Sequence, residues 1–153
     1  MVRPGIILYG CAPSAQVNLP GLRPVLQLKA TIAMIKEVPE GGQISYGRTF
    51  TAPCPMRVAT LAAGYADGYP RLLSGQGMVG IHGTTAQLLG RVCMAQLVVD
   101  VPHIPKARPG DAATPFGGGG AHTTEQPAAT PGTTPHQLFC GLGPRVPPPY
   151  LGT

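Results

Sequence analysis

Short runs of alternating apolar and polar residues follow one another from Pro24 to Asp100, each bounded by glycine, proline or polar residues. Alternation with a period of two is typical of strands that bury one face. The longest run, Val25 to Val38, is rich in β-branched residues and stops at Pro39. We therefore predict a strand there, and further strands at Ile44 to Phe50, Met56 to Ala63, Met78 to Ile81, Thr85 to Leu89 and Gln96 to Val101.

The spacing of these runs predicts the fold class. Several short strands separated by turn residues are typical of an antiparallel β-barrel or sandwich, so the chain is predicted to be mainly β. The connection His82-Gly83-Thr84 is short enough for a β-hairpin. The segment from Ile6 to Gly10 fits either a short helix or the end of a strand, and the pattern does not choose between them.

The composition separates a folded part from a loose part. Of the 153 residues, 22 are glycine and 19 are proline, and only 11% are charged, against about 25% in typical domains. From Gly117 to Pro135 the chain is mostly Gly, Ala, Thr and Pro. Such a segment cannot bury enough apolar surface to offset its ordering entropy, so it is predicted to be flexible.

The charge pattern argues against nucleic acid as a partner. The net charge is +5, but the eleven Lys and Arg residues are spread singly from Arg3 to Arg145. Nucleic-acid binding needs clustered cations. The four cysteines lie about forty residues apart, and no histidine stands at ligand spacing to another, which argues against zinc. No signal-peptide pattern and no run of eighteen apolar residues occurs, so we expect no membrane role and reduced thiols in the cytoplasm.

Two motifs concentrate the residues that could do chemistry. The first, Gly64-Tyr65-Ala66-Asp67-Gly68-Tyr69-Pro70-Arg71, ends an apolar run in a predicted tight turn. The second, Gly90-Arg91-Val92-Cys93-Met94-Ala95-Gln96, opens an apolar segment with a Gly-Arg pair. In this order and spacing the two motifs resemble the C-terminal domain of alanine racemase, a pyridoxal-phosphate enzyme that interconverts L- and D-alanine. The alternative is that Tyr65 and Tyr69 are ordinary aromatic residues at a strand end.

The resemblance extends over most of the chain. Met1 to Gly10 is similar to the family segment that closes the cofactor-binding barrel, and Cys140 to Pro147 is similar to its closing segment. This implies four parts. Residues 1–20 are a remnant of the end of that (β/α)8 barrel, and 21–116 form the C-terminal β-domain. Residues 117–135 form the flexible segment and 136–153 the closing segment.

Three departures from the family pattern stand out. Ala95 occupies a position where the family usually has an acid after Met. The strand expected after Pro109-Gly110-Asp111 should be apolar and β-branched, but Ala112 to Pro115 is neither. Pro115 removes a hydrogen-bond donor, so this stretch is predicted to be an edge strand or no strand. The segment from Gly117 to Pro135 replaces a helix of the family.

The resemblance also implies the site residues. Tyr65 matches the tyrosine that one subunit supplies to the active site of its partner. In the family this tyrosine transfers a proton on one face of the substrate α-carbon, and a lysine does so on the other face. Met94 matches a residue whose backbone amide meets the substrate carboxylate. Arg3 matches the arginine facing the pyridine nitrogen of pyridoxal 5'-phosphate, and Gly5 and Ile6 match the pair near its phosphate. A free phenol has a pKa near 10, so a tyrosine base needs cationic or hydrogen-bonding help.

For the chain as a whole, these matches imply an amino-acid racemase that makes D-alanine for peptidoglycan in the cytoplasm as a homodimer with shared sites. Serine remains an alternative substrate. Because Met1 falls inside the family's sequence, we expect a fragment that is inactive alone. No lysine of the chain stands in the context of the family's cofactor lysine. Two other hypotheses stay open: a β-barrel that binds a partner without chemistry, and a fragment without function. Asp67 and Arg71 are expected to hold the turn. Tyr46 and Tyr69 are expected to pack, with a place lining the active site as the alternative.

Overall fold

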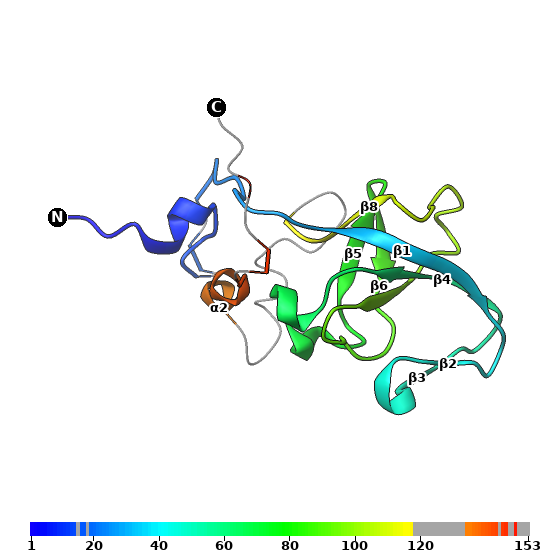
Figure 1. The fold of residues 1–153 in the computed structure, drawn as a ribbon. Helices are drawn as coiled ribbons and strands as arrows, with labels where there is room; N and C mark the ends of the chain where they lie inside the picture. The colour runs from blue at the N-terminus through cyan, green and yellow to red at the C-terminus, as the bar shows by residue number, and fades with distance from the viewer. Residues whose placement is uncertain (15, 18, 118–133, 144, 147–148, 150–153) are drawn as a thin grey trace.

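A computed structural model describes residues 1–14, 16–17, 19–117, 134–143, 145–146 and 149 of the chain. Strands dominate the described part, and η1 and α2 lie together at one end of it (Figure 1). The strands are β1 (Leu28–Val38), β2 (Gln43–Ile44), β3 (Phe50–Thr51), β4 (Met56–Leu61), β5 (Met78–Ile81), β6 (Thr84–Gln87), β7 (Leu97–Asp100) and β8 (Ala112–Phe116). The 3-10 helices are η1 (Gly5–Tyr9), η2 (Tyr46–Arg48), η3 (Tyr65–Asp67) and η4 (Arg71–Leu73), and the α-helix is α2 (Pro135–Gly141).

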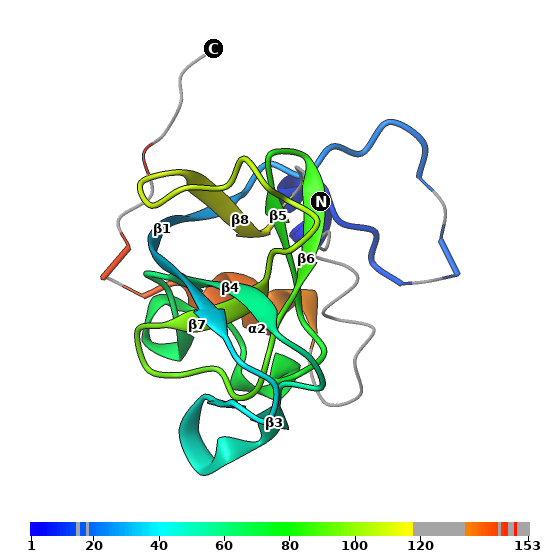
Figure 2. The same ribbon diagram turned by 90° about the vertical axis from the view of Figure 1, so that its right-hand side faces the viewer.

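The main sheet confirms the predicted mainly β, antiparallel fold. Its six strands lie in the order β6-β5-β8-β1-β4-β7, and every neighbouring pair is antiparallel. The two outer strands approach each other, because Leu88 forms an isolated bridge with Val99 and the Leu89 N–H donates to the Val98 carbonyl at 2.8 Å. Figure 2 shows the strands curled around a common interior. The sheet is therefore nearly closed into a barrel.

β1 joins the two halves of this sheet. Its first half pairs with β8 and its second half with β4. Leu28, Ala30 and Ile32 are buried at alternate positions, as expected for a strand with one face on the core. The register with β4 shifts between Ile32 and Met34. A bulge of this kind bends a strand, which lets one strand serve both sides of a curved sheet.

The prediction of one strand at Ile44 to Phe50 was wrong. Two short strands, β2 and β3, pair with each other, and η2 turns the chain between them. The reason is backbone conformation: Ser45, Gly47 and Arg48 have φ of 69°, 72° and 51°. These values lie in the left-handed region, which cannot continue a strand.

The prediction that Ala112 to Pro115 forms an edge strand or no strand was also wrong. β8 lies inside the sheet between β5 and β1. Pro115 is tolerated because the paired positions avoid it. Pairing with β5 ends at Thr114, and pairing with β1 skips from Ala113 to Phe116 at an irregularity. The missing N–H of Pro115 therefore falls at a bulge, where proline is accepted in sheets.

The predicted hairpin is confirmed, with a turn one residue shorter than His82-Gly83-Thr84 because Thr84 belongs to β6. β5 and β6 pair up to Ile81 and Thr84, leaving two residues in the turn. His82 and Gly83 have φ of 51° and 76°, the pair of positive values that a type I′ turn requires. His82 Nε2 lies 3.0 Å from Asp111 Oδ2, so the hairpin tip contacts the residue that precedes β8.

The structure near the two ends of the chain decides between helix and strand for the segment from Ile6 to Gly10. It does not describe most of the predicted flexible segment. The segment from Ile6 to Gly10, for which helix and strand were both open, belongs to the 3-10 helix η1. Thr134 caps α2, because its Oγ1 accepts the Gln137 N–H at 3.3 Å. Most of the predicted flexible segment, residues 118–133, lies outside the described residues.

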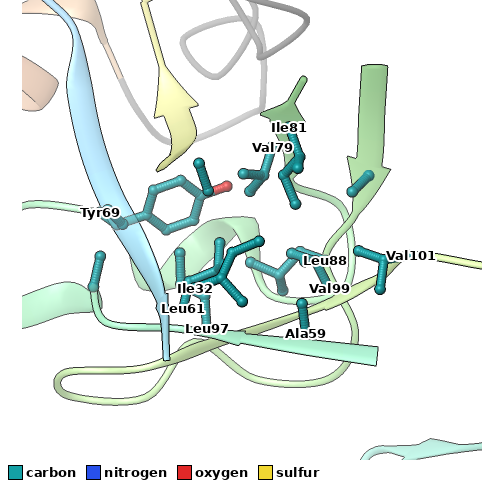
Figure 3. Packing of buried hydrophobic residues seen from close by; sticks show 14 of the residues in the cluster. Ile32, Ala59, Leu61, Tyr69, Val79, Ile81, Leu88, Leu97, Val99 and Val101 are labelled. Atoms are coloured by element: carbon teal, nitrogen blue, oxygen red, sulfur yellow. The ribbon is translucent and has the colours of Figure 1, made fainter. Parts of the chain in front are cut away.

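Tyr69 fills the centre of the core. It is 1% exposed and belongs to a cluster with residues of all six strands of the main sheet. Figure 3 shows its ring among Ile32, Leu61, Val79 and Ile81. Its hydroxyl has no hydrogen-bond partner within the described residues, and the lack of a side chain at Gly77 leaves room for it. Burial raises the pKa of Tyr69 well above its usual value. The expectation that Tyr69 packs is confirmed, whereas the same expectation for Tyr46 was wrong, because Tyr46 is exposed on η2.

This burial predicts how stability responds to Tyr69→Phe. Because the substitution deletes a buried hydroxyl without a partner, the free energy of unfolding should stay unchanged or rise by about 1–3 kcal/mol. In the unfolded chain a tyrosine ionises near pH 10, whereas folded Tyr69 keeps its proton. Stability of the parent should therefore fall as pH rises above about 10, and this part of the fall should vanish in the variant.

Urea unfolding of parent and variant at pH 7 and at pH 10.5 measures both effects. Tyr69→Ala is the control for ring packing and should lower the free energy of unfolding by about 3–5 kcal/mol at both pH values. A Tyr69→Phe loss above about 2 kcal/mol would show that the hydroxyl has a partner after all.

Candidate functional site

The first motif forms a tight turn directly after β4. Gly64 is its pivot: the Gly64 carbonyl accepts the N–H of Asp67 at 3.1 Å and that of Tyr69 at 3.1 Å. The Asp67 carboxylate returns the contact, since its Oδ2 accepts the Gly64 N–H at 2.9 Å. Gly68 then has φ of 98°, a value that favours glycine. The turn exposes Tyr65 and directs Tyr69 into the core.

The structure brings the two motifs together through their backbones. The Tyr65 N–H donates to the Cys93 carbonyl at 3.0 Å, and the Ala66 N–H donates to the Met94 carbonyl at 2.9 Å. A side chain on Gly64 would collide with these same two carbonyls. Gly64 has an extended backbone, so this glycine is required for close approach and not for its φ. Tyr65 is thereby fixed beside Met94.

Both predicted substrate-facing residues are accessible. The exposed fraction is 47% for Tyr65 and 55% for Met94, although both are large apolar residues. The Met94 N–H makes no backbone hydrogen bond within the described residues, whereas the Cys93 N–H donates to the Gln96 carbonyl at 3.1 Å. The Tyr65 phenol is therefore accessible, and the Met94 N–H has no backbone acceptor among the described residues.

Two serine hydroxyls hold the second motif from either side. Ser45 Oγ donates to the Arg91 carbonyl at 2.6 Å and lies 3.6 Å from Cys93 Sγ. Ser74 Oγ accepts the Val92 N–H at 3.0 Å and donates to the Arg71 carbonyl at 2.6 Å. The motif is therefore tied to both η2 and η4.

An open depression lies along this segment. It is lined by Arg71, Leu72, Ser74 and Arg91. Neither arginine forms an ion pair with a described acidic residue. The depression is therefore a cationic surface beside the second motif.

Arg3, Gly5 and Ile6 lie on a different element from Tyr65 and Met94. Arg3 and Gly5 are exposed at the start of η1, and Ile6 is buried. The link between the two groups is α2. On one side Phe139 stacks on Tyr9 of η1, with ring centroids 4.6 Å apart. On the other side, a side chain on Gly68 would collide with Gly141 at the end of α2.

Sequence reasoning missed the C-terminal contribution to this turn. Arg145 Nε lies 3.5 Å from Asp67 Oδ1, and the Asp67 side chain is only 13% exposed. The Asp67-Gly68 pair signals a turn in the sequence. Nothing in the local sequence indicates that its cation comes from Arg145, because the two residues are far apart along the chain.

Metal sites and membrane spans were searched in the part of the chain that the structure describes. No group of three or more His, Cys, Asp or Glu side chains there could hold a metal ion. No helix among those residues has the length and apolarity needed to cross a membrane.

Comparison with known proteins gives one consistent family. The model of the alanine racemase C-terminal domain matches residues 25–150. The chain is 46% identical over 154 residues to the alanine racemase of Desulforamulus reducens, covering 99% of this chain and 41% of that protein. It is 45% identical over 152 residues to the alanine racemase of Desulfovibrio desulfuricans, with coverage of 99% and 41%.

Solved structures agree with this match. The biosynthetic alanine racemase of Pseudomonas aeruginosa superposes with a TM-score of 0.89 at 37% identity, covering 97% of this chain and 41% of that one. Alanine racemase of Bartonella henselae with covalently bound pyridoxal phosphate gives a TM-score of 0.83 at 30% identity, with coverage of 92% and 39%. The chain thus spans about two fifths of the length of these relatives. It belongs to the alanine racemase family and matches the C-terminal domain of that family.

Proposed function

We propose that this chain supplies the C-terminal part of a pyridoxal-phosphate-dependent alanine racemase. The reaction is the interconversion of L- and D-alanine, in the cytoplasm, for peptidoglycan synthesis. One observation supports it most: backbone hydrogen bonds join the turn that bears the accessible Tyr65 to Cys93 and Met94 of the second motif. The family resemblance assigns Tyr65 and Met94 to the substrate. Their juxtaposition is what a shared substrate would need.

Tyr65 is proposed to move a proton at its Oη. Racemisation removes a proton from one face of the α-carbon and returns one to the other face, so each face needs an acid-base group. A group in that role must be positioned within hydrogen-bond reach of the carbon-bound proton. Two backbone hydrogen bonds hold the turn that bears Tyr65. The Tyr65 N–H donates to the Cys93 carbonyl at 3.0 Å, and the Ala66 N–H donates to the Met94 carbonyl at 2.9 Å. A half-exposed side chain on such a turn is available to a ligand from outside.

Met94 is proposed to orient the substrate through its backbone. The Met94 N–H has no backbone acceptor among the described residues, so it can donate to a carboxylate, which would keep the α-carbon in one place relative to Tyr65. The side chain is not needed for this, so the role tolerates drift at the position. Ala95 follows without the usual acid of the family, and it leaves the Met94 amide itself in place.

The residues proposed for the cofactor fit a phosphate and a ring nitrogen. The N–H groups of Gly5 and Ile6 stand at the first positions of η1, where a helix has no internal acceptor for them. Arg3 is exposed and forms no ion pair within the described residues, so its guanidinium is free to donate to a pyridine nitrogen. Pyridoxal phosphate, when bound, would supply the electron sink for the α-carbon.

A homodimer is proposed as the assembly. Tyr65 and Met94 are exposed, as are Tyr46 and Leu72 on neighbouring turns, at 73% and 46%. Exposed apolar side chains gathered around one surface are typical of an interaction site. The resemblance implies that this surface completes the site of a second copy.

The first test asks whether Tyr65 is the base. The chain is fused in frame behind the part of the Desulforamulus reducens alanine racemase that its match leaves uncovered. The fusion should racemise alanine. Tyr65→Phe keeps the ring and removes only Oη, so racemisation should fall by about two or more orders of magnitude while cofactor absorbance is retained.

Tyr46→Phe in the same fusion is the matched control, because it removes the hydroxyl of another exposed tyrosine and keeps the apolar ring that the proposed dimer surface would use. It should stay within about threefold of the parent. If Tyr65→Phe also stays within a few-fold, Tyr65 is not the base. A fusion that folds and takes up cofactor but racemises no amino acid would favour the binding-module alternative.

The second test asks whether the 153-residue chain holds the cofactor by itself. Lys29, Lys36 and Lys106 are all exposed, on β1 or on the loop before β8, and none matches the family's cofactor lysine. Pyridoxal phosphate should therefore label the purified chain only weakly and without selectivity. Borohydride reduction followed by peptide mass spectrometry measures this. A stoichiometric adduct on one of the three lysines would contradict the assignment.

A further inference from the structure

The Asp67 carboxylate closes the turn that bears Tyr65. One oxygen, Oδ2, accepts the Gly64 N–H at 2.9 Å, and the Asp67 N–H donates back to the Gly64 carbonyl at 3.1 Å. Gly64 is buried, so its N–H cannot turn to water if Asp67 is removed. Tyr65 lies between these two residues. The orientation of its backbone therefore depends on a side chain two positions away.

The second carboxylate oxygen connects this turn to the C-terminal segment. Asp67 Oδ1 lies 3.5 Å from Arg145 Nε, and the Asp67 side chain is 13% exposed while that of Arg145 is 49% exposed. Close packing accompanies the ion pair, because Gly68 has no room for a side chain against Gly141. The turn is thus held by its own carboxylate and fixed from outside by the segment that follows α2.

The geometry points to a role for this pair: Asp67 is a positioning residue for Tyr65, and Arg145 supports it from the C-terminal segment. This inference rests on the proposed function of Tyr65 as an acid-base group. Asp67 itself touches no reacting atom, since both of its oxygens are engaged within the fold. Its effect is on where Oη stands. A displacement of about 1 Å in an acid-base group can cost a hundredfold in rate.

The chain contains a matched control for this effect. Asp111 forms the same kind of turn in the loop before β8: its Oδ2 accepts the Arg108 N–H at 2.8 Å, and its own N–H donates to the Arg108 carbonyl at 3.2 Å. It also lies close to a second side chain, since its Oδ2 is 3.0 Å from His82 Nε2. Asp111→Ala removes a turn of equal type without touching the turn of Tyr65.

The test uses the active fusion enzyme and measures the ratio of α-hydrogen exchange to inversion. Loss of folded protein does not change this ratio. Alanine is incubated in D2O, and α-hydrogen exchange and inversion are followed for each enantiomer by NMR and chiral chromatography. Fewer active molecules lower both rates equally. A misplaced Tyr65 slows only the proton transfer on its own face, so exchange without inversion of one enantiomer should rise relative to inversion.

Asp67→Ala is expected to raise this exchange-to-inversion ratio by about tenfold or more. Asp67→Asn keeps an acceptor oxygen for the Gly64 N–H and loses the charge, so it should raise the ratio by only about two- to threefold. Arg145→Gln should resemble Asp67→Asn, and Arg145→Lys should restore the parent ratio to within about twofold. Asp111→Ala should leave the ratio at the parent value.

Three outcomes overturn the inference. The first is an exchange-to-inversion ratio that stays at the parent value in Asp67→Ala. The second is a ratio that rises as much in Asp111→Ala as in Asp67→Ala. If thermal melting shows that Asp67→Ala does not fold, Asp67→Asn and Arg145→Gln decide, and parent ratios in both reject the role of the pair. Tyr65→Phe is measured alongside. If Tyr65→Phe racemises alanine as fast as the parent, the proposed base is wrong. If Tyr65→Phe loses racemisation but Asp67→Ala keeps the parent exchange-to-inversion ratio, only the positioning role is rejected.

Discussion

The structure of the candidate site depends on one close approach between two backbones. Gly64 lies so near the Cys93 and Met94 carbonyls that only a hydrogen atom fits in place of a side chain. That approach permits the two hydrogen bonds from Tyr65 and Ala66, each worth roughly 0.5–1.5 kcal/mol net. Because backbone groups form them, the position of Tyr65 relative to Met94 is independent of the side chains in the second motif. Drift at Ala95 is compatible with an intact site for the same reason.

The same turn gives two tyrosines opposite environments. Tyr65 is half exposed and Tyr69, four positions later, is buried among residues of the sheet. The direction change comes from Gly64 and Gly68, which bracket η3. The motif therefore has two physical parts: a phenol offered to a ligand, and a ring that anchors the turn to the core. A sequence containing both tyrosines does not by itself say which is which, and the resemblance to the family was needed to single out Tyr65.

Local pattern was enough for most of the sheet. Alternation predicted the strand at Met78 to Ile81 as observed. The short connection His82-Gly83-Thr84 predicted the hairpin, although the observed turn is one residue shorter. The two errors arose where the backbone conformation or chemistry of individual residues overrode the alternation of apolar and polar positions. At Ser45 and Arg48, positive φ values broke a predicted strand that contains apolar residues. At Pro115 the missing donor suggested an edge, but an irregularity in the pairing of β8 with β1 leaves Pro115 outside the paired positions. Such long-range compensation, like the partnership of Asp67 with Arg145, is invisible to a window of neighbouring residues.

The near closure of the main sheet has a consequence for how this domain can associate. β6 and β7 would be its free edges, yet the bridge between Leu88 and Val99 brings them together. This contact occupies part of both edges, which leaves less unpaired backbone to template another strand and reduces the hazard of edge-to-edge addition. Contacts of the barrel with a second copy are then expected through side chains and loops. The exposed turns around Tyr65 and Met94 offer such a surface, and recognition would be governed by its shape and chemistry rather than by strand pairing.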